Sequence, residues 1–117
     1  MRDLKSFPTV YLCAKPVDMR KAINGLSVIV EAELSLTAFS GAVFVFVNKA
    51  RDILKLLYWD KTGFALWHKR LEKERFKWPK ASAMHVEVTP EQLTWLLDGY
   101  DISRMRAHEK LNYKSVL

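Results

Sequence analysis

The stretch Ala42–Trp59, AVFVFVNKARDILKLLYW, decides the fold. Its first six residues are an apolar run rich in β-branched and aromatic side chains, which is typical of a central strand covered on both faces. Residues 48–52 are a short polar connector, and a second apolar run, Ile53–Trp59, follows. So short a connection between two strands favours an antiparallel hairpin, which we expect at the centre of a sheet.

Further strands are predicted on both sides of this hairpin. Val10–Ala14 (VYLCA) and His85–Val88 (HVEV) are each predicted as a short strand. Arg75–Trp78 is also predicted as a strand, with its two aromatic side chains on one face and its basic side chains on the other. Residues 64–72 fit either a helix or a strand, and the pattern leaves both open.

Two principal helices are expected. Apolar residues recur at helical spacing from Met19 to Leu34, and Asp18 is the predicted N-cap of this first helix. The second helix, Pro90–Asp98, has a stronger start, because Thr89 and Gln92 match a capping box around a proline in the first turn. Gly99 is its predicted C-terminal stop.

These elements predict an α+β fold in which a small, mainly antiparallel sheet packs with two principal helices. A chain of 117 residues is the size of one domain. We expect that domain to span residues 1–102 and to be followed by a basic C-terminal tail, residues 103–117. Large aromatic residues dominate small cores, so the four tryptophans are expected to contribute mainly to packing.

The net charge of +6 is concentrated in one part of the chain. Residues 49–80 hold ten basic and four acidic side chains, and this difference equals the whole net charge. The basic ones are Lys49, Arg51, Lys55, Lys61, Lys69, Arg70, Lys73, Arg75, Lys77 and Lys80. Such a field attracts polyanions. The alternative is a solvated basic face that has no partner.

Aromatic residues are interspersed with these charges in the segment Lys55–Pro79. Surfaces that bind nucleic acid combine positive charge for phosphates with flat aromatic groups nearby. The segment therefore indicates binding rather than catalysis. The expected phosphate contacts are Lys69, Arg70, Lys73, Arg75 and Lys77.

No residue pattern in the sequence indicates catalysis, a metal site or the binding of another cofactor. Asp18, Asp60 and Asp98 are better explained as cap, turn and helix-end residues than as ligands of catalytic metal ions. The three histidines are scattered and make no zinc pattern with the single cysteine, Cys13. We expect Cys13 to be a buried, unreactive thiol. A metal-dependent nuclease is kept only as a control hypothesis, which predicts cleavage that needs Asp18 and Asp60.

The expected location is the cytoplasm, without a membrane partner. The first residues contain no signal peptide, and the longest apolar run, Ala42–Val47, is too short to span a bilayer. One cysteine allows no internal disulfide, which suits a reducing compartment.

Four motifs together carry a family resemblance. They are DMRKAINGL at Asp18–Leu26, FSGAVFVF at Phe39–Phe46, KLLYWDKTGFALWHKRLEKERFKWP at Lys55–Pro79 and VTPEQLTWLLDGYD at Val88–Asp101. Over roughly residues 10–101 the chain resembles the small TnpB (Orf2-like) accessory protein of the insertion-sequence-66 family of bacterial transposable elements. The resemblance implies a non-catalytic protein needed for transposition, encoded beside a larger transposase that holds the catalytic site.

Two functions are compatible with this resemblance. The first is DNA binding at the ends of the element through the basic, aromatic-flanked surface, which Arg20 and Lys21 would extend. These two residues would lie in the first turn of the first helix, where positive charge opposes the helix dipole, and this suggests another use. The second is a protein–protein adaptor that docks on the transposase without contacting DNA. The sequence leaves homo-oligomerisation open.

Overall fold

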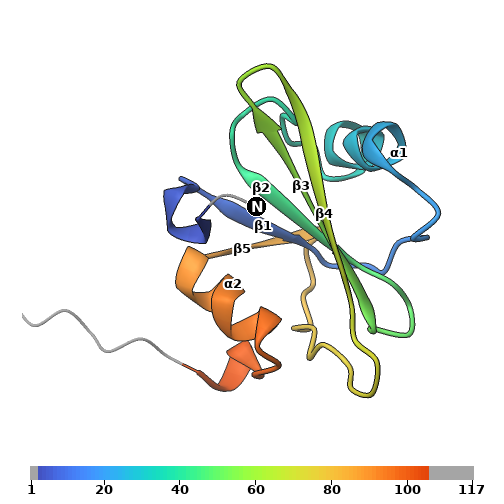
Figure 1. Cartoon of the computed structure of the whole chain (residues 1–117), viewed down its shortest axis with the longest axis vertical. Helices are drawn as coiled ribbons and strands as arrows, with labels where there is room; N and C mark the ends of the chain where they lie inside the picture. The colour runs from blue at the N-terminus through green and yellow to red at the C-terminus, as the bar shows by residue number, and fades with distance from the viewer. Residues whose placement is uncertain (1–2, 106–117) are drawn as a thin grey trace, which may run out of the picture.

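The computed structural model describes residues 3–105 and confirms the α+β class (Figure 1). Its regular elements are η1 (Leu4–Ser6), β1 (Val10–Cys13), α1 (Ile23–Val28), the π-helical η2 (Ile29–Glu33), β2 (Val43–Val47), β3 (Ile53–Asp60), β4 (Gly63–Arg70), β5 (His85–Val88), α2 (Pro90–Leu97) and η3 (Ile102–Arg104). Among the described residues, no helix has the length and apolar character that crossing a bilayer requires.

The five strands of the described residues form one sheet in the order β4-β3-β2-β1-β5. The predicted hairpin is confirmed, because β2 and β3 pair antiparallel with Val45 opposite Leu56. The undecided stretch 64–72 is largely strand β4, which pairs antiparallel with β3. The pairing of β1 with β2 is parallel, with Leu12 opposite Val45, and β5 closes the sheet antiparallel to β1.

The sheet is covered on both faces, as the unbroken apolar run of β2 predicts. Val43, Val45 and Val47 face one core, which α2, η1 and the segment after β4 complete. Phe44 and Phe46 face the other core, beneath α1 and η2. All five residues of β2 are fully buried, so this strand is the centre of the molecule.

The predicted start of the first helix is wrong. It begins at Ile23 after Ala22, and Asp18 is not its N-cap. The physical reason is a contact distant in sequence: the buried ammonium of Lys55 donates hydrogen bonds to the carbonyl oxygens of Met19 (2.8 Å) and Lys21 (2.9 Å). These bonds hold residues 19–21 outside the helix, so the expected position of a basic pair in its first turn is also wrong.

The predicted strand Arg75–Trp78 is wrong as well. Residues 71–84, called here the β4–β5 connection, contain no strand. The predicted alternation of aromatic and basic side chains is nevertheless confirmed, because Phe76 and Trp78 are buried while Arg75 and Lys77 are exposed. The connection makes isolated hydrogen bonds in place of a ladder: the Phe76 amide donates to the Arg51 carbonyl (2.7 Å), and the Trp78 indole donates to the Cys13 carbonyl (2.9 Å).

Helix α2 agrees with its sequence signals. The hydroxyl of Thr89 accepts a hydrogen bond from the Gln92 amide (3.0 Å), and the Gln92 side chain accepts one from the Thr89 amide (2.8 Å). These reciprocal bonds complete the predicted capping box. At the other end Gly99 adopts φ +96°, and the amides of Gly99 and Tyr100 bond to the carbonyls of Leu96 and Trp95, which is a Schellman stop.

Two further predictions concern the thiol of Cys13 and the end of the domain. The Cys13 thiol is buried, and burial raises its pKa above the ordinary value, which agrees with an unreactive thiol. The boundary between domain and tail stays a prediction: Ile102 packs in the core and η3 follows it, while residues 106–117 lie outside the described part.

Candidate nucleic-acid interface

A basic hollow opens at one end of the molecule, where three segments distant in sequence meet. They are the β2–β3 turn (residues 48–52), the β4–β5 connection and the stretch that follows α2. The hollow has a volume of about 1040 Å³. Its lining residues are Lys49, Ala50, Arg51, Glu74, Arg75, Phe76, Lys77, Trp78, Pro79, Lys80, Gly99, Asp101 and Ser103.

The β2–β3 turn that forms one wall is organised by Asn48. The Asn48 side-chain oxygen accepts hydrogen bonds from the amides of Asp52 and Ile53, both at 3.0 Å. Its amide nitrogen donates to the Asp52 carboxylate at 2.7 Å. The Arg51 amide bonds to the Asn48 carbonyl at 3.0 Å and closes a tight turn. One side chain thus fixes the backbone that carries Lys49 and Arg51.

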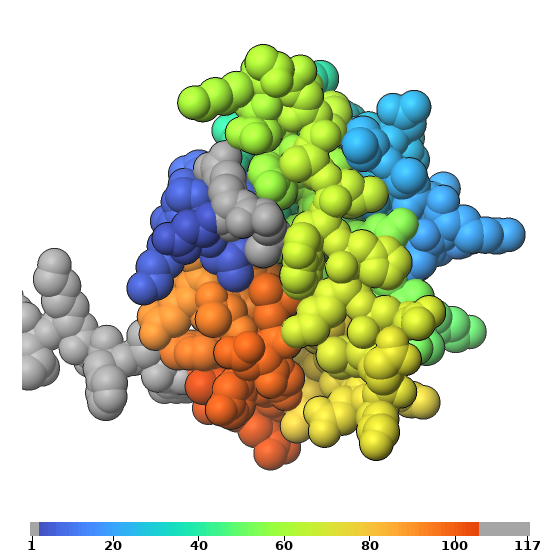
Figure 2. All heavy atoms as spheres, in the orientation of Figure 1, coloured from blue at the N-terminus to red at the C-terminus, as the bar shows by residue number. Residues whose placement is uncertain are grey.

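The second wall is tied to the first by backbone hydrogen bonds. The amides of Leu71 and Phe76 donate to the carbonyls of Asp52 and Arg51, each at 2.7 Å. The connection, yellow in Figure 2, therefore lies between the green atoms of the β2–β3 turn and the orange atoms of α2. Two bonds to adjacent residues of the turn fix the relative position of these walls.

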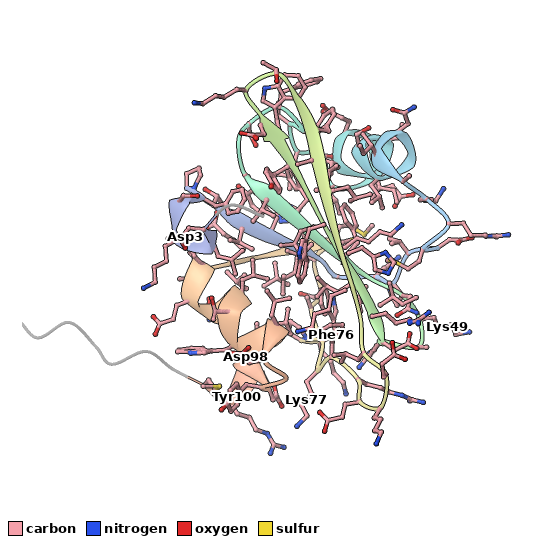
Figure 3. The ribbon with its side chains drawn as sticks, viewed as in Figure 1. Asp3, Lys49, Phe76, Lys77, Asp98 and Tyr100 are labelled. Carbon is pink, nitrogen blue, oxygen red and sulfur yellow. The ribbon has the colours of Figure 1, made fainter. Side chains whose placement is uncertain are left out.

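Buried aromatic residues set the direction of the basic side chains on the connection. Phe76 is 1% exposed and Trp78 is 6% exposed, and both pack in the core that α2 covers. Since alternate residues of an extended chain point to opposite sides, Arg75 and Lys77 are directed toward solvent. In Figure 3, Phe76 lies between α2 and the β2–β3 turn, Lys77 lies beside the end of α2, and Lys49 lies on the turn.

The hollow is positively charged. Five lining residues are basic and two are acidic, which gives +3. One of the acids, Asp101, accepts hydrogen bonds from the Ser103 hydroxyl and amide, and these bonds lower the pKa of its carboxyl. Arg104, 3.5 Å from the same carboxylate, acts in the same direction. Asp101 therefore stays ionised at neutral pH while much of its hydrogen-bonding capacity is already used.

The structure brings together only some of the predicted contact residues. Arg75 and Lys77 line the hollow, whereas Lys73 is exposed on the same connection but does not line it. Lys69 and Arg70 lie on β4. The Lys69 ammonium is 3.4 Å from the Leu97 carbonyl at the end of α2, and Arg70 pairs with Glu72 at 3.3 Å.

Neither of the other two predicted residues lines the basic hollow, and Arg20 belongs to a second hollow beside it. Arg20 lines it, its side chain is 92% exposed, and its guanidinium pairs with the Asp18 carboxylate. Hydrogen bonds from Arg20 hold the pKa of Asp18 at about 2. Lys21 is exposed but does not line this hollow. The second hollow, called here the Arg20 hollow, measures about 620 Å³ and shares Lys49 and Ala50 with the basic hollow.

Sequence reasoning missed three basic residues of the hollow, Lys49, Arg51 and Lys80. All three are among the ten basic residues of the segment 49–80, so the distribution of charge along the sequence already indicates them. Their grouping depends on the backbone bond from Phe76 to Arg51, which joins segments 25 positions apart in the numbering. No pattern in the neighbouring sequence predicts a hydrogen bond between such distant segments.

The chemistry available at this surface is the binding of anions. Five basic groups around one hollow can neutralise phosphate or carboxylate oxygens. Within residues 3–105, no group of three or more histidine, cysteine, aspartate or glutamate side chains is placed to hold a metal ion.

Comparison with known proteins agrees with the sequence motifs. The family model described as "IS66 Orf2 like protein" matches residues 8–107. Two proteins of Sinorhizobium fredii, y4hO and y4jC, are 35% and 33% identical over 92 and 97 residues. The matches cover 79% and 83% of this chain, and 80% and 83% of the relatives. No solved structure matches. The chain therefore belongs to the family of IS66 Orf2-like proteins.

Proposed function

We propose that this accessory protein of IS66 transposition binds the DNA of the element through the basic hollow. The observation that carries the proposal is the convergence of Lys49, Arg51, Arg75, Lys77 and Lys80 on one hollow whose walls are fixed by backbone hydrogen bonds. A backbone that is already held in place loses less conformational entropy on binding than a mobile one, which favours a phosphate-binding role over that of a solvated face.

The expected energetics are those of phosphate neutralisation. Duplex DNA releases condensed counterions when lysine and arginine side chains neutralise its phosphates. If the hollow and its surroundings neutralise about five phosphates, the logarithm of the binding constant falls with the logarithm of salt with a slope of about −4.5. Lys69, Arg70 and Lys73 would add contacts at the periphery, as would Arg20 and Lys21.

The test is fluorescence anisotropy of a labelled duplex that carries the terminal repeat of the element, with a scrambled duplex beside it, over a salt series. The variant Arg75→Ala/Lys77→Ala removes two charges from the hollow, and Lys61→Ala removes one at the opposite end of β3. We expect the double variant to weaken binding and to make the salt slope about two units shallower. Lys61→Ala and Lys73→Ala, measured separately, should have smaller effects.

Two results would contradict the proposal. One is a salt slope near zero. The other is an equal loss of affinity in Lys61→Ala and in the double variant, which would indicate an unspecific effect of net charge. A preference for the terminal repeat over the scrambled duplex would make the protein an end-recognition factor.

A second candidate function is the adaptor that docks on the transposase, and a specific surface favours it. Phe39 is 58% exposed and Val28 is 62% exposed, and both line a hollow of about 210 Å³ beside α1 and η2. Phe39, Trp59 and Phe64 pack ring against ring there, with centroids 5.0–5.2 Å apart. Exposed aromatic residues in a pocket are typical of protein interfaces.

The adaptor is tested by titration of the purified transposase with the chain, without DNA. Phe39→Ser should weaken that complex and leave DNA binding unchanged, whereas Arg75→Ala/Lys77→Ala should do the reverse. An interaction with transposase that survives Phe39→Ser and Val28→Ser would exclude this surface as the docking site.

A further inference from the structure

The two edges of the sheet differ in length and in how well they are protected. Within the described residues, β5 forms one edge and β4 the other. β5 has four residues, and the exposed Glu87 places a charge on it. β4 has eight residues and pairs with β3 one to one along its whole length. Short strands, bulges, proline and charge keep sheet edges from pairing with other chains. The stretch Gly63–Trp67 of β4 contains no charge, no proline and no bulge.

The ladder between β3 and β4 shows which backbone groups of β4 face outward. The Leu71 amide donates to the Asp52 carbonyl, so this pair bonds directly. Because the amides of an antiparallel strand point alternately to its two sides, the odd-numbered residues of β4 bond to β3 and the even-numbered ones face outward. The outward residues are Phe64, Leu66, His68 and Arg70. Within residues 3–105, no other segment bonds to the backbone groups of these four residues.

The side chains on both faces of this edge are apolar and only partly covered. Phe64 and Leu66 pack against the core beneath α1. Ala65 and Trp67 pack against the core that α2 covers, and none of the four is fully buried. The yellow-green atoms of β4 lie at the surface in Figure 2. A hollow of about 470 Å³ between Leu66 and residues 22–25 gives room on the α1 side for the side chains of an added strand.

The distribution of charge along β4 favours a second copy of the chain as that strand. The uncharged stretch Gly63–Trp67 leads into Lys69 and Arg70, and the basic hollow lies beyond the same end. A two-fold axis joins a strand antiparallel to its own copy. The basic end of each β4 then lies beside the uncharged end of the other, which avoids like charges directly opposite. The two basic hollows lie at opposite ends of the joint and do not repel each other closely.

We propose that the outer edge of β4 pairs antiparallel with β4 of a second copy, so that two five-stranded sheets join into one. The even-numbered residues of the two strands exchange backbone hydrogen bonds across the two-fold axis, and the apolar side chains of each edge are covered by the other copy. The interface consists of one strand from each copy and is small, so the dimer forms only as the protein concentration rises. The pairing goes beyond the proposed function and does not depend on it.

Sedimentation velocity without DNA, over a series of protein concentrations, measures the pairing. His68→Pro removes one outward amide donor, and the matched control His68→Ala loses the same imidazole but keeps the donor. His68 is exposed, so neither change opens a cavity, and circular dichroism checks that both variants fold. We expect the unchanged protein and His68→Ala to approach twice the monomer mass of 13.6 kDa. His68→Pro should need about tenfold more protein to dimerise, because the bond is lost on both sides of the axis.

Hydrogen exchange of the unchanged protein is a second measurement, which needs no variant. As the concentration rises, the even-numbered amides of β4 should gain protection, whereas the amides of β5 should not change. The pairing would be overturned by a protein that stays monomeric throughout the series, by a dimer in which these amides gain no protection, or by a folded His68→Pro that dimerises as His68→Ala does. Protection of the same amides only after purified transposase is added would assign the edge to that partner and also overturn self-pairing.

Discussion

The indole nitrogen of Trp78 donates a 2.9 Å hydrogen bond to the carbonyl oxygen of Cys13, 65 residues earlier in the chain. The bond ties the β4–β5 connection to the end of β1, a strand in the interior of the sheet. Lys77 precedes Trp78, so its direction depends on this anchor. The packing of the core thus determines where one cation of the basic hollow is placed.

Trp78→Phe should destabilise the protein and weaken binding at the hollow. Phenylalanine keeps most of the apolar contact but cannot donate to the Cys13 carbonyl, and a lost buried hydrogen bond costs about 1–3 kcal/mol. Urea denaturation measures the free energy of unfolding. Trp59→Phe, at a half-buried site at the far end of β3, is the control and should cost less. An equal loss in both variants would argue against a special role for the Trp78 bond.

Lys55→Met should release the segment that precedes α1. Methionine fills similar space but cannot donate to the Met19 and Lys21 carbonyls, and hydrogen bonds to a charged group contribute about 1.5–3 kcal/mol. We expect a lower free energy of unfolding and faster hydrogen exchange at residues 19–26, with the amides of β2 unchanged. Lys49→Met, at an exposed position, should alter stability by less than about 0.5 kcal/mol. Unchanged exchange in Lys55→Met would refute the anchoring role of Lys55.

Thr89→Ala should remove the capping box of α2. The hydroxyl that accepts from the Gln92 amide is lost, and substitution of an N-cap residue costs about 1 kcal/mol. Chemical denaturation of Thr89→Ala beside Thr94→Ala gives the comparison, because the Thr94 hydroxyl only donates to the Pro90 carbonyl within the helix. We expect the cap variant to be the less stable of the two, and the reverse order would contradict the capping argument.

The carboxyl of Asp18 should titrate with a pKa of about 2, and Arg20→Gln should return that pKa toward its usual value of about 3.9. Lys21→Gln should change it little, since Arg20 is the main cause of the shift. Because the pKa is lower in the folded chain, the pair stabilises it above about pH 4, and this contribution disappears as the pH falls through 2. The pair is exposed, so the effect on unfolding is small. Carboxyl NMR measures these values directly.

The features that could be predicted from the sequence are those that local chemistry determines. The hairpin follows from two apolar runs separated by five polar or small residues, and α2 follows from Thr89, Gln92 and Gly99 acting within one helix. The α+β class follows from these elements. The start of α1 could not be predicted, because Lys55 captures carbonyls 34 and 36 residues away.

The sequence predicts that the candidate site is basic, but it does not predict which residues line the hollow. The alternation of buried and exposed residues correctly separates Phe76 and Trp78 from Arg75 and Lys77, although no strand forms there. Lys49 and Arg51 join the hollow because Phe76 bonds to the turn that carries them. Arg20 lies outside the basic hollow because its segment is anchored by Lys55. Both outcomes depend on tertiary hydrogen bonds that leave no periodic trace in a sequence.

The position of β1 between β2 and β5 has a consequence for how the chain folds as the ribosome makes it. The strands β1 to β4 can pair once residue 70 has emerged, but the outer edge of β1 has no partner until His85–Val88 follows. Until then the chain carries an open, apolar strand edge, which is a template for association with other chains. A nascent chain arrested between β4 and β5 should therefore be prone to aggregation, and completion of β5 should end this exposure.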